Sequence, residues 1–172
     1  IHYRTILKDI KSYPLTIDYS NAITKTILEM LSAYDQQEIK CGELLKAAIE
    51  LAQYIYNYDP NNIFLLNYLQ AVKRKRKLVL SETNKLLSII KMDNCNLNEK
   101  IGAAILLEDF EQVEMLFKQL SSDEKNEFDH YPIANLWKKM VDKKELPLDT
   151  AEQISHMKPT EQKTLADAIE KE

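Results

Sequence analysis

Residues 47–62 limit the possible folds of this chain more than any other stretch. Residues 47–55 read AAIELAQYI, a helical pattern of small and large apolar residues, and residues 59–62 read DPNN, a compact turn. Small alanines on one face of a helix let a second helix approach closely. Because Pro60 disfavours helix in the residue before it, we expect the first helix to end there and a second to begin at Ile63. The pattern predicts antiparallel helix pairs joined by short turns.

The composition favours the same fold class. Only 2 of the 172 residues are glycine and 5 are proline, which is too few for the many turns of a β-sandwich or for glycine-rich nucleotide-binding loops. The chain is 45% hydrophobic and 29% charged, as is usual for globular domains. No apolar run approaches the ~20 residues of a membrane-spanning helix. We therefore expect an all-α protein that does not enter a membrane.

The cysteines and the first residue indicate the setting. Cys41 and Cys95 are far apart and have no paired spacing, which favours free thiols in a reducing, cytoplasmic environment. The chain begins with Ile1 instead of methionine. We interpret it as a piece of a longer intracellular protein.

Charge is distributed unevenly along the chain. The net charge is −4, and it divides into +3 for residues 1–100 and −7 for residues 101–172. An acidic second half argues against a general nucleic-acid binder, because attraction to phosphates requires a basic face. A local basic patch in the first half remains compatible with these charges.

The periodicity of apolar residues predicts about ten helices. Residues 1–16 form an N-terminal arm or short helix, residues 17–145 form a domain of helical hairpins, and residues 146–172 form a C-terminal helical pair. Within this plan the predicted helices span residues 17–33, 37–58, 63–79, 81–91, 101–107, 110–120 and 133–141, with a last helix after Pro159. Ser121 with Glu124 matches a capping box. Ser81 is a predicted N-cap, Pro147 a predicted break, and Asp149 with Glu152 a second capping pair.

The stretch 37–120 resembles the tetratricopeptide repeat, a helix-turn-helix unit of 34 residues. The matching residues are Ala48 and Ala52 at small packing positions, Ile55 where a small residue is usual, Pro60 at the closing proline, and Leu66 and Leu69 in the first helix of the next unit. Gln70 stands where the repeat usually has glycine, and residues 103–120 repeat the pattern more faintly. The resemblance implies a short α-solenoid of stacked hairpins with a surface that docks peptides or helices. A closed helical bundle is the alternative.

The basic run Lys73-Arg74-Lys75-Arg76-Lys77 is the sharpest local motif. One interpretation is a patch that binds phosphate groups or a partner. The other is a solvated helix end, where cations suit the exposed carbonyl groups. We favour the second interpretation, because five successive residues encircle a helix and do not share one face.

Aromatic and amide residues near the DPNN turn are the other binding candidates. Tyr54, Tyr58 and Tyr68, together with Tyr56, could line a groove, although such residues more often pack between helices. Asn67 could bind a peptide backbone, although a solvated asparagine is more common.

No pattern indicates catalysis, a metal or a cofactor. His2, His130 and His156 are isolated, and neither cysteine has a partner at ligand spacing. No arginine precedes a histidine at the Arg-x4-His spacing of helical ribonucleases. We expect a non-enzymatic module that binds a protein or peptide partner or self-associates. Two alternatives remain: a nucleic-acid-binding accessory domain that uses residues 73–77, and a helical part of a nuclease or hydrolase whose catalytic residues lie elsewhere.

Overall fold

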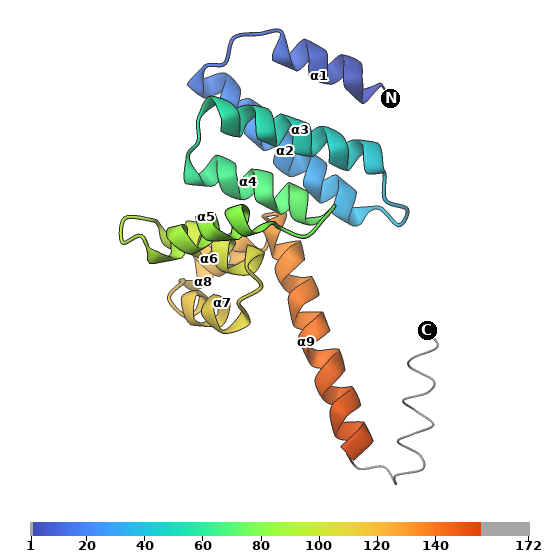
Figure 1. Ribbon diagram of the computed structural model, residues 1–172, viewed down its shortest axis with the longest axis vertical. Helices are drawn as coiled ribbons and strands as arrows, with labels where there is room; N and C mark the ends of the chain where they lie inside the picture. Colours follow the sequence, from blue (N-terminus) through green and yellow to red (C-terminus); the bar gives the residue numbers. More distant parts are fainter. Residues whose placement is uncertain (1, 156–172) are drawn as a thin grey trace. The chain divides into compact units, whose positions relative to one another are not determined.

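The structure is a computed structural model that describes the backbone of residues 2–155 and the side chains of residues 2–144, and it is all-helical over that range (Figure 1). The helices are α1 (Tyr3–Lys11), α2 (Ile17–Gln36), α3 (Gly42–Tyr58), α4 (Asn62–Lys73), α5 (Leu80–Lys91), α6 (Leu97–Leu106), α7 (Phe110–Phe117), α8 (Ser122–Phe128) and α9 (Ile133–Ser155). No β-strand occurs among these residues. The expected all-α class is confirmed.

The chain divides into two compact units, Ile1–Leu136 and Trp137–Glu172. Helix α9 begins in the first unit and continues into the second. Every site described below lies in the first unit. No helix within residues 2–155 has both the length and the apolar character needed to cross a membrane.

Local side-chain caps explain where most of the helices begin. Thr16, Asn61 and Asp109 each accept a hydrogen bond from the backbone N–H three residues ahead, which satisfies a donor that the helix leaves free. Asn96 and Ser121 form full capping boxes, with Glu99 and Glu124 returning a carboxylate to the cap N–H. The predicted Ser121–Glu124 box is confirmed.

Helix α3 lies at the centre of the N-terminal half of this unit and packs against α1, α2 and α4. Its contact face consists of Ala47, Ala48, Leu51, Ala52 and Ile55, all buried, with Ala48 fully inaccessible to solvent. Burying apolar surface stabilises a fold by roughly 25 cal/mol per Å². The alanine pattern of residues 47–55 therefore marks the main helix-packing surface, as the sequence indicates.

Packing continues from α4 toward the other end of the unit. Helix α4 contacts α2 and α3 on one side and α6 on the other, and α6 packs against both α5 and α7. In Figure 1, α1 and α7 lie at opposite ends of this series. Helix α5 packs on α6 and not closely on α4, so α4 and α5 do not form a close hairpin.

Several predicted helix boundaries are wrong. Helix α2 continues through residues 34–36, which the sequence predicts as a connector, and α3 begins at Gly42 and not at residue 37. Ile39, inside the predicted helix 37–58, lies in the loop before α3 and is 90% exposed. The arm before Pro14 is a short helix, α1. Helix α6 begins at Leu97, four residues earlier than expected. Helix α7 ends at Phe117.

The basic run does not continue α4. The helix ends at Lys73, and α5 begins at Leu80 with Val79 as its N-cap, so the expected helix 63–79 and the expected Ser81 cap are both wrong. The Glu82 carboxylate accepts the Val79 N–H at 2.9 Å and the Arg76 guanidinium at 2.8 Å. These two bonds fix the start of α5 at Leu80. Ser81 therefore lies inside the helix and is not its N-cap.

Helix α9 runs through Pro147, where the sequence predicts a break. Asp149 and Glu152 consequently lie inside the helix and not at its N-terminus. A proline removes one backbone donor and commonly kinks a helix, but the turns on either side can persist. The helix expected after Pro159 lies outside the described residues.

Candidate binding groove

Two amide side chains on α4 form the most unusual polar feature of the first unit. Gln70 Nε2 donates a hydrogen bond to Asn67 Oδ1 at 3.1 Å, one helical turn away. The other polar atoms of the pair, Asn67 Nδ2 and Gln70 Oε1, are buried and have no hydrogen-bond partner among the described residues. Each such group costs roughly 1–3 kcal/mol of stability. A buried donor and a buried acceptor thus lie side by side, unpaired.

Both residues line a groove of about 290 Å³. Helices α2, α4 and α6 line it, together with Tyr131 and the first residue of α9. The lining residues are Thr24 and Leu28 of α2, Ile63, Leu66, Asn67 and Gln70 of α4, Asn96, Asn98, Glu99 and Gly102 at the N-cap and in the first half of α6, and Tyr131 and Ile133. Most of the wall is apolar. The amide pair therefore provides specific polar contacts within a hydrophobic groove, an arrangement common in ligand sites.

Gly102 forms part of the groove wall on α6. A methyl group at its Cα would lie 3.5 Å from Leu66 Cδ1 and 3.5 Å from Ile133 Cδ1, which are ordinary contact distances. An alanine would therefore fit at this position without a clash. The absence of a side chain leaves space between Leu66 and Ile133.

The charged groups at the groove are already engaged. Glu99 accepts the backbone N–H of Asn96 at 3.0 Å in the α6 capping box. Tyr131 donates its hydroxyl hydrogen bond to Glu127 at 2.8 Å, and this bond, with burial, raises the pKa of Tyr131 above its usual value. Apart from the Glu99 carboxylate, the groove thus presents neutral groups to a ligand.

The predicted tyrosines do not share one groove. Tyr56 stacks on Tyr68 with ring centroids 6.2 Å apart, and the Lys85 ammonium lies 5.5 Å from the Tyr56 ring centre. Tyr54 lies beneath Lys11 toward α1, and Tyr58 donates a hydrogen bond to the Leu15 carbonyl at 3.1 Å. Of the predicted binding residues around the turn, only Asn67 lines the 290 Å³ groove described above.

The basic run is divided among separate structural contacts. Lys73 donates to the Leu106 carbonyl at 2.8 Å and lies 3.7 Å from Glu108, and Arg76 pairs with Glu82. The side chain of Arg74 is buried and pairs with Asp35. Only Lys75 and Lys77 are exposed without a partner in the described part of the chain, so the run does not present a five-residue basic patch.

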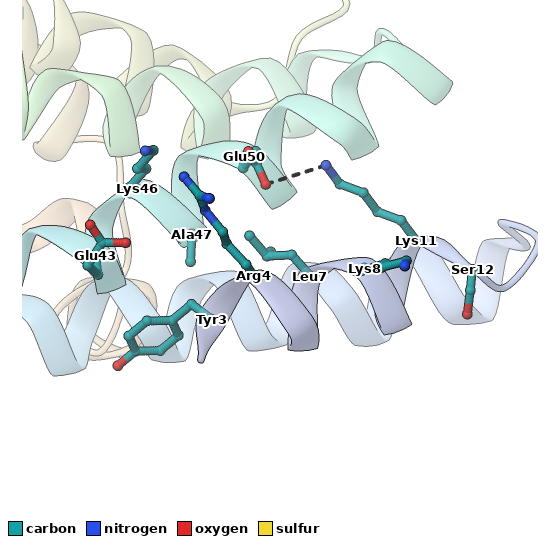
Figure 2. A pocket seen from close by; sticks show the side chains of 10 residues that line it. All are labelled: Tyr3, Arg4, Leu7, Lys8, Lys11, Ser12, Glu43, Lys46, Ala47 and Glu50. Carbon is teal, nitrogen blue, oxygen red and sulfur yellow. Dashed lines mark hydrogen bonds and ion pairs between the residues drawn. The ribbon is translucent and has the colours of Figure 1, made fainter. Parts of the chain in front are cut away.

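A second, larger cleft of about 670 Å³ lies between α1 and α3 (Figure 2). Its floor is apolar, with Tyr3 and the buried Leu7 and Ala47. Its rim is charged, with Arg4, Lys8, Lys11 and Lys46 opposed by Glu43 and Glu50. Lys11 and Glu50 form an ion pair across the cleft at 3.5 Å.

No cluster of three or more potential metal ligands occurs among the described residues. Comparison with known proteins finds no family model, no curated protein and no solved structure that matches this chain.

Sequence reasoning missed Gln70 as a site residue. The signal was present, because Asn67 and Gln70 interrupt the otherwise apolar α4 segment NIFLLNYLQAVK at positions one turn apart. Polar residues at this spacing on a buried helix face each need a partner.

Proposed function

We propose that this chain is a non-enzymatic peptide-binding module whose groove holds an extended, uncharged segment of a partner protein. The unpaired donor of Asn67 and the unpaired acceptor of Gln70, buried together in an apolar groove, carry this proposal. Native proteins rarely bury polar groups without partners, and a ligand that supplies the missing bonds is one reason to retain them.

The chemistry of the pair matches a peptide backbone. In an extended strand the N–H and C=O of one residue point to the same side and bond to one neighbour. Asn67 Nδ2 would donate to that carbonyl, and Gln70 Oε1 would accept that N–H. The match does not depend on which amide atom is oxygen, since exchanging both amides still leaves one donor and one acceptor.

The residues that line the groove determine which ligand side chains it can accept. Leu28, Leu66 and Ile133 offer apolar contact, and the charged residue Glu99 is occupied by its capping bond. An apolar residue on the ligand would bury surface here, whereas an acidic one would lose its hydration beside the Glu99 carboxylate. The proposed ligand is therefore a neutral segment with aliphatic side chains.

The arrangement we propose around the groove is the tetratricopeptide-like solenoid, with the closed bundle as the alternative. It is supported by the position of the groove on α2, α4 and α6, three alternate helices along the chain of which α4 contacts both of the others. A larger cytoplasmic protein would use such a module as a scaffold.

The test is a binding screen with short, capped, uncharged peptides that carry aliphatic side chains, measured by fluorescence polarisation. Gln70→Met keeps the size of the side chain and removes its acceptor, and we expect it to weaken binding at least about tenfold, which is about 1.4 kcal/mol. Gln53→Met makes the same change at an exposed position of α3 and should leave binding unchanged. Failure of all peptides to bind, or equal affinity for the Gln70→Met protein, would refute the proposal.

A further inference from the structure

The cleft between α1 and α3 has more cations than the protein itself neutralises. Lys11 pairs with Glu50, while Arg4, Lys8 and Lys46 are exposed and form no ion pair with any described residue. In Figure 2, Arg4 extends from α1 toward α3, above the apolar floor of Leu7 and Ala47. The cleft is therefore locally positive in a chain whose net charge is −4.

The other end of the unit has the opposite charge. Residues 108–129, which include α7 and α8, contain eight acidic residues and two lysines. On α7, Val113 and Leu116 face the core, and Glu111, Glu114, Met115 and Lys118 are exposed at helical spacing. Met115 is 52% exposed, so this outer face carries an apolar side chain beside two carboxylates.

We propose that the α1–α3 cleft binds the outer face of α7 from a second copy of this chain. The contact is complementary in two ways: Glu111 and Glu114 meet the uncompensated cations Arg4 and Lys46, and Met115 enters against Leu7 and Ala47. Opposite charges across an interface direct the approach and set the register of two partners. Methionine adapts well to irregular apolar surfaces.

The position of the two surfaces determines the type of assembly. The contacts run from α1 through α3, α4 and α6 to α7, so the cleft and the α7 face lie at opposite ends of the unit (Figure 1). They cannot meet within one copy. Two different surfaces on each copy form a head-to-tail contact, which grows into an open chain unless the geometry closes a ring.

The test is analytical ultracentrifugation of the whole chain over a range of concentrations. We expect its average mass to rise with concentration at about 20 mM salt and to fall at about 500 mM salt, where charges are screened over a few ångströms. Circular dichroism checks that each variant below is folded, and all of the substituted residues are exposed.

Two charge-reversal variants separate the surfaces. The cleft variant carries Arg4→Glu and Lys46→Glu, and the face variant carries Glu111→Lys and Glu114→Lys. Each alone should associate at least about tenfold more weakly than the original chain. In an equimolar mixture the intact face can meet the intact cleft and the reversed face can meet the reversed cleft, so the mixture should associate where neither variant alone does. A chain with all four substitutions should regain self-association.

A control variant with Lys25→Glu and Glu29→Lys changes exposed charges of α2 outside both surfaces and should associate like the original chain. The proposal is overturned if the chain stays monomeric at low salt, or if the mixture of the two variants forms no dimer. Peptide binding in the Asn67–Gln70 groove is measured separately, and either result can fail without the other.

Discussion

Arg74 at the end of α4 forms a two-point ion pair with Asp35 near the end of α2. Nε lies 2.8 Å from Oδ1 and Nη2 lies 2.8 Å from Oδ2. The side chains are only 1% and 7% exposed. Arg74 also donates to the Gln70 and Pro132 carbonyls, and Asn135 donates to Asp35 at 2.8 Å. This network joins α2, α4 and the start of α9 beside the groove, and it uses one residue of a run that looks like a binding patch in the sequence.

Breaking this pair should destabilise the protein strongly. We expect Asp35→Ala to cost about 3–5 kcal/mol, because it leaves a buried guanidinium without its counter-charge. Urea unfolding followed by circular dichroism measures the loss. Arg76→Ala, which removes the exposed partner of Glu82, should cost less than about 1 kcal/mol. Similar losses for the two variants would mean that the Arg74–Asp35 pair is not effectively buried.

Glu82 should make stability depend on pH in acid. Its hydrogen bond with Arg76 is the main cause that lowers its pKa below the usual 4.5, and the Val79 N–H adds to the effect. Because the pKa is lower in the folded state, the contribution of Glu82 is present above about pH 4.5 and is lost as the pH falls through the lowered value. Urea midpoints of the original chain and of Glu82→Gln should therefore differ at pH 7 and converge as the pH falls below the lowered pKa of Glu82. Glu29→Gln, at an exposed position on α2, serves as the matched control, and an equal gap at both pH values would contradict the assignment.

Gly102→Ala should stabilise the protein but weaken its binding of peptides. The substitution favours helix by about 1 kcal/mol, and its methyl group meets Leu66 and Ile133 at 3.5 Å without a clash. We expect a higher urea midpoint together with weaker binding of neutral peptides, because the methyl group narrows the groove. Gly42→Ala, where a methyl group would meet nothing within 4 Å, tests a glycine outside the groove and should leave binding intact. Stronger peptide binding by the Gly102→Ala protein would contradict the proposed site.

Glu108 adopts a left-handed backbone conformation, with φ of 56°, at the turn between α6 and α7. This conformation costs an ordinary residue roughly 1–2 kcal/mol, and glycine avoids the cost. We expect Glu108→Gly to raise stability by about 0.5–1 kcal/mol, since the weak contact with Lys73 and the added freedom of the unfolded chain offset part of the gain. Thermal unfolding measures the change. Glu111→Gly, inside α7, should have the opposite sign.

Local sequence patterns correctly predicted the features that depend only on residues within one or two helical turns. The Ser121–Glu124 box acts over three residues, and the alanines of residues 47–55 mark a packing face at any position in a helical fold. The local prediction was wrong between residues 73 and 81, because the backbone there depends on the carboxylates with which Arg74 and Arg76 pair. Glu82 is six residues from Arg76, and Asp35 is 39 residues from Arg74.

The residues of the candidate site were likewise predicted only in part from the sequence. By itself, the sequence determined an all-α chain and its central alanine-rich helix, and it offered Asn67 as a candidate binding residue. Only the tertiary structure decided that Gln70 lies beside Asn67 with both amides half-satisfied, that the tyrosines separate, and that Arg74 is buried. The physical reason is range: caps and helical periodicity act within one or two turns, whereas burial and ion pairing depend on residues that only folding brings together.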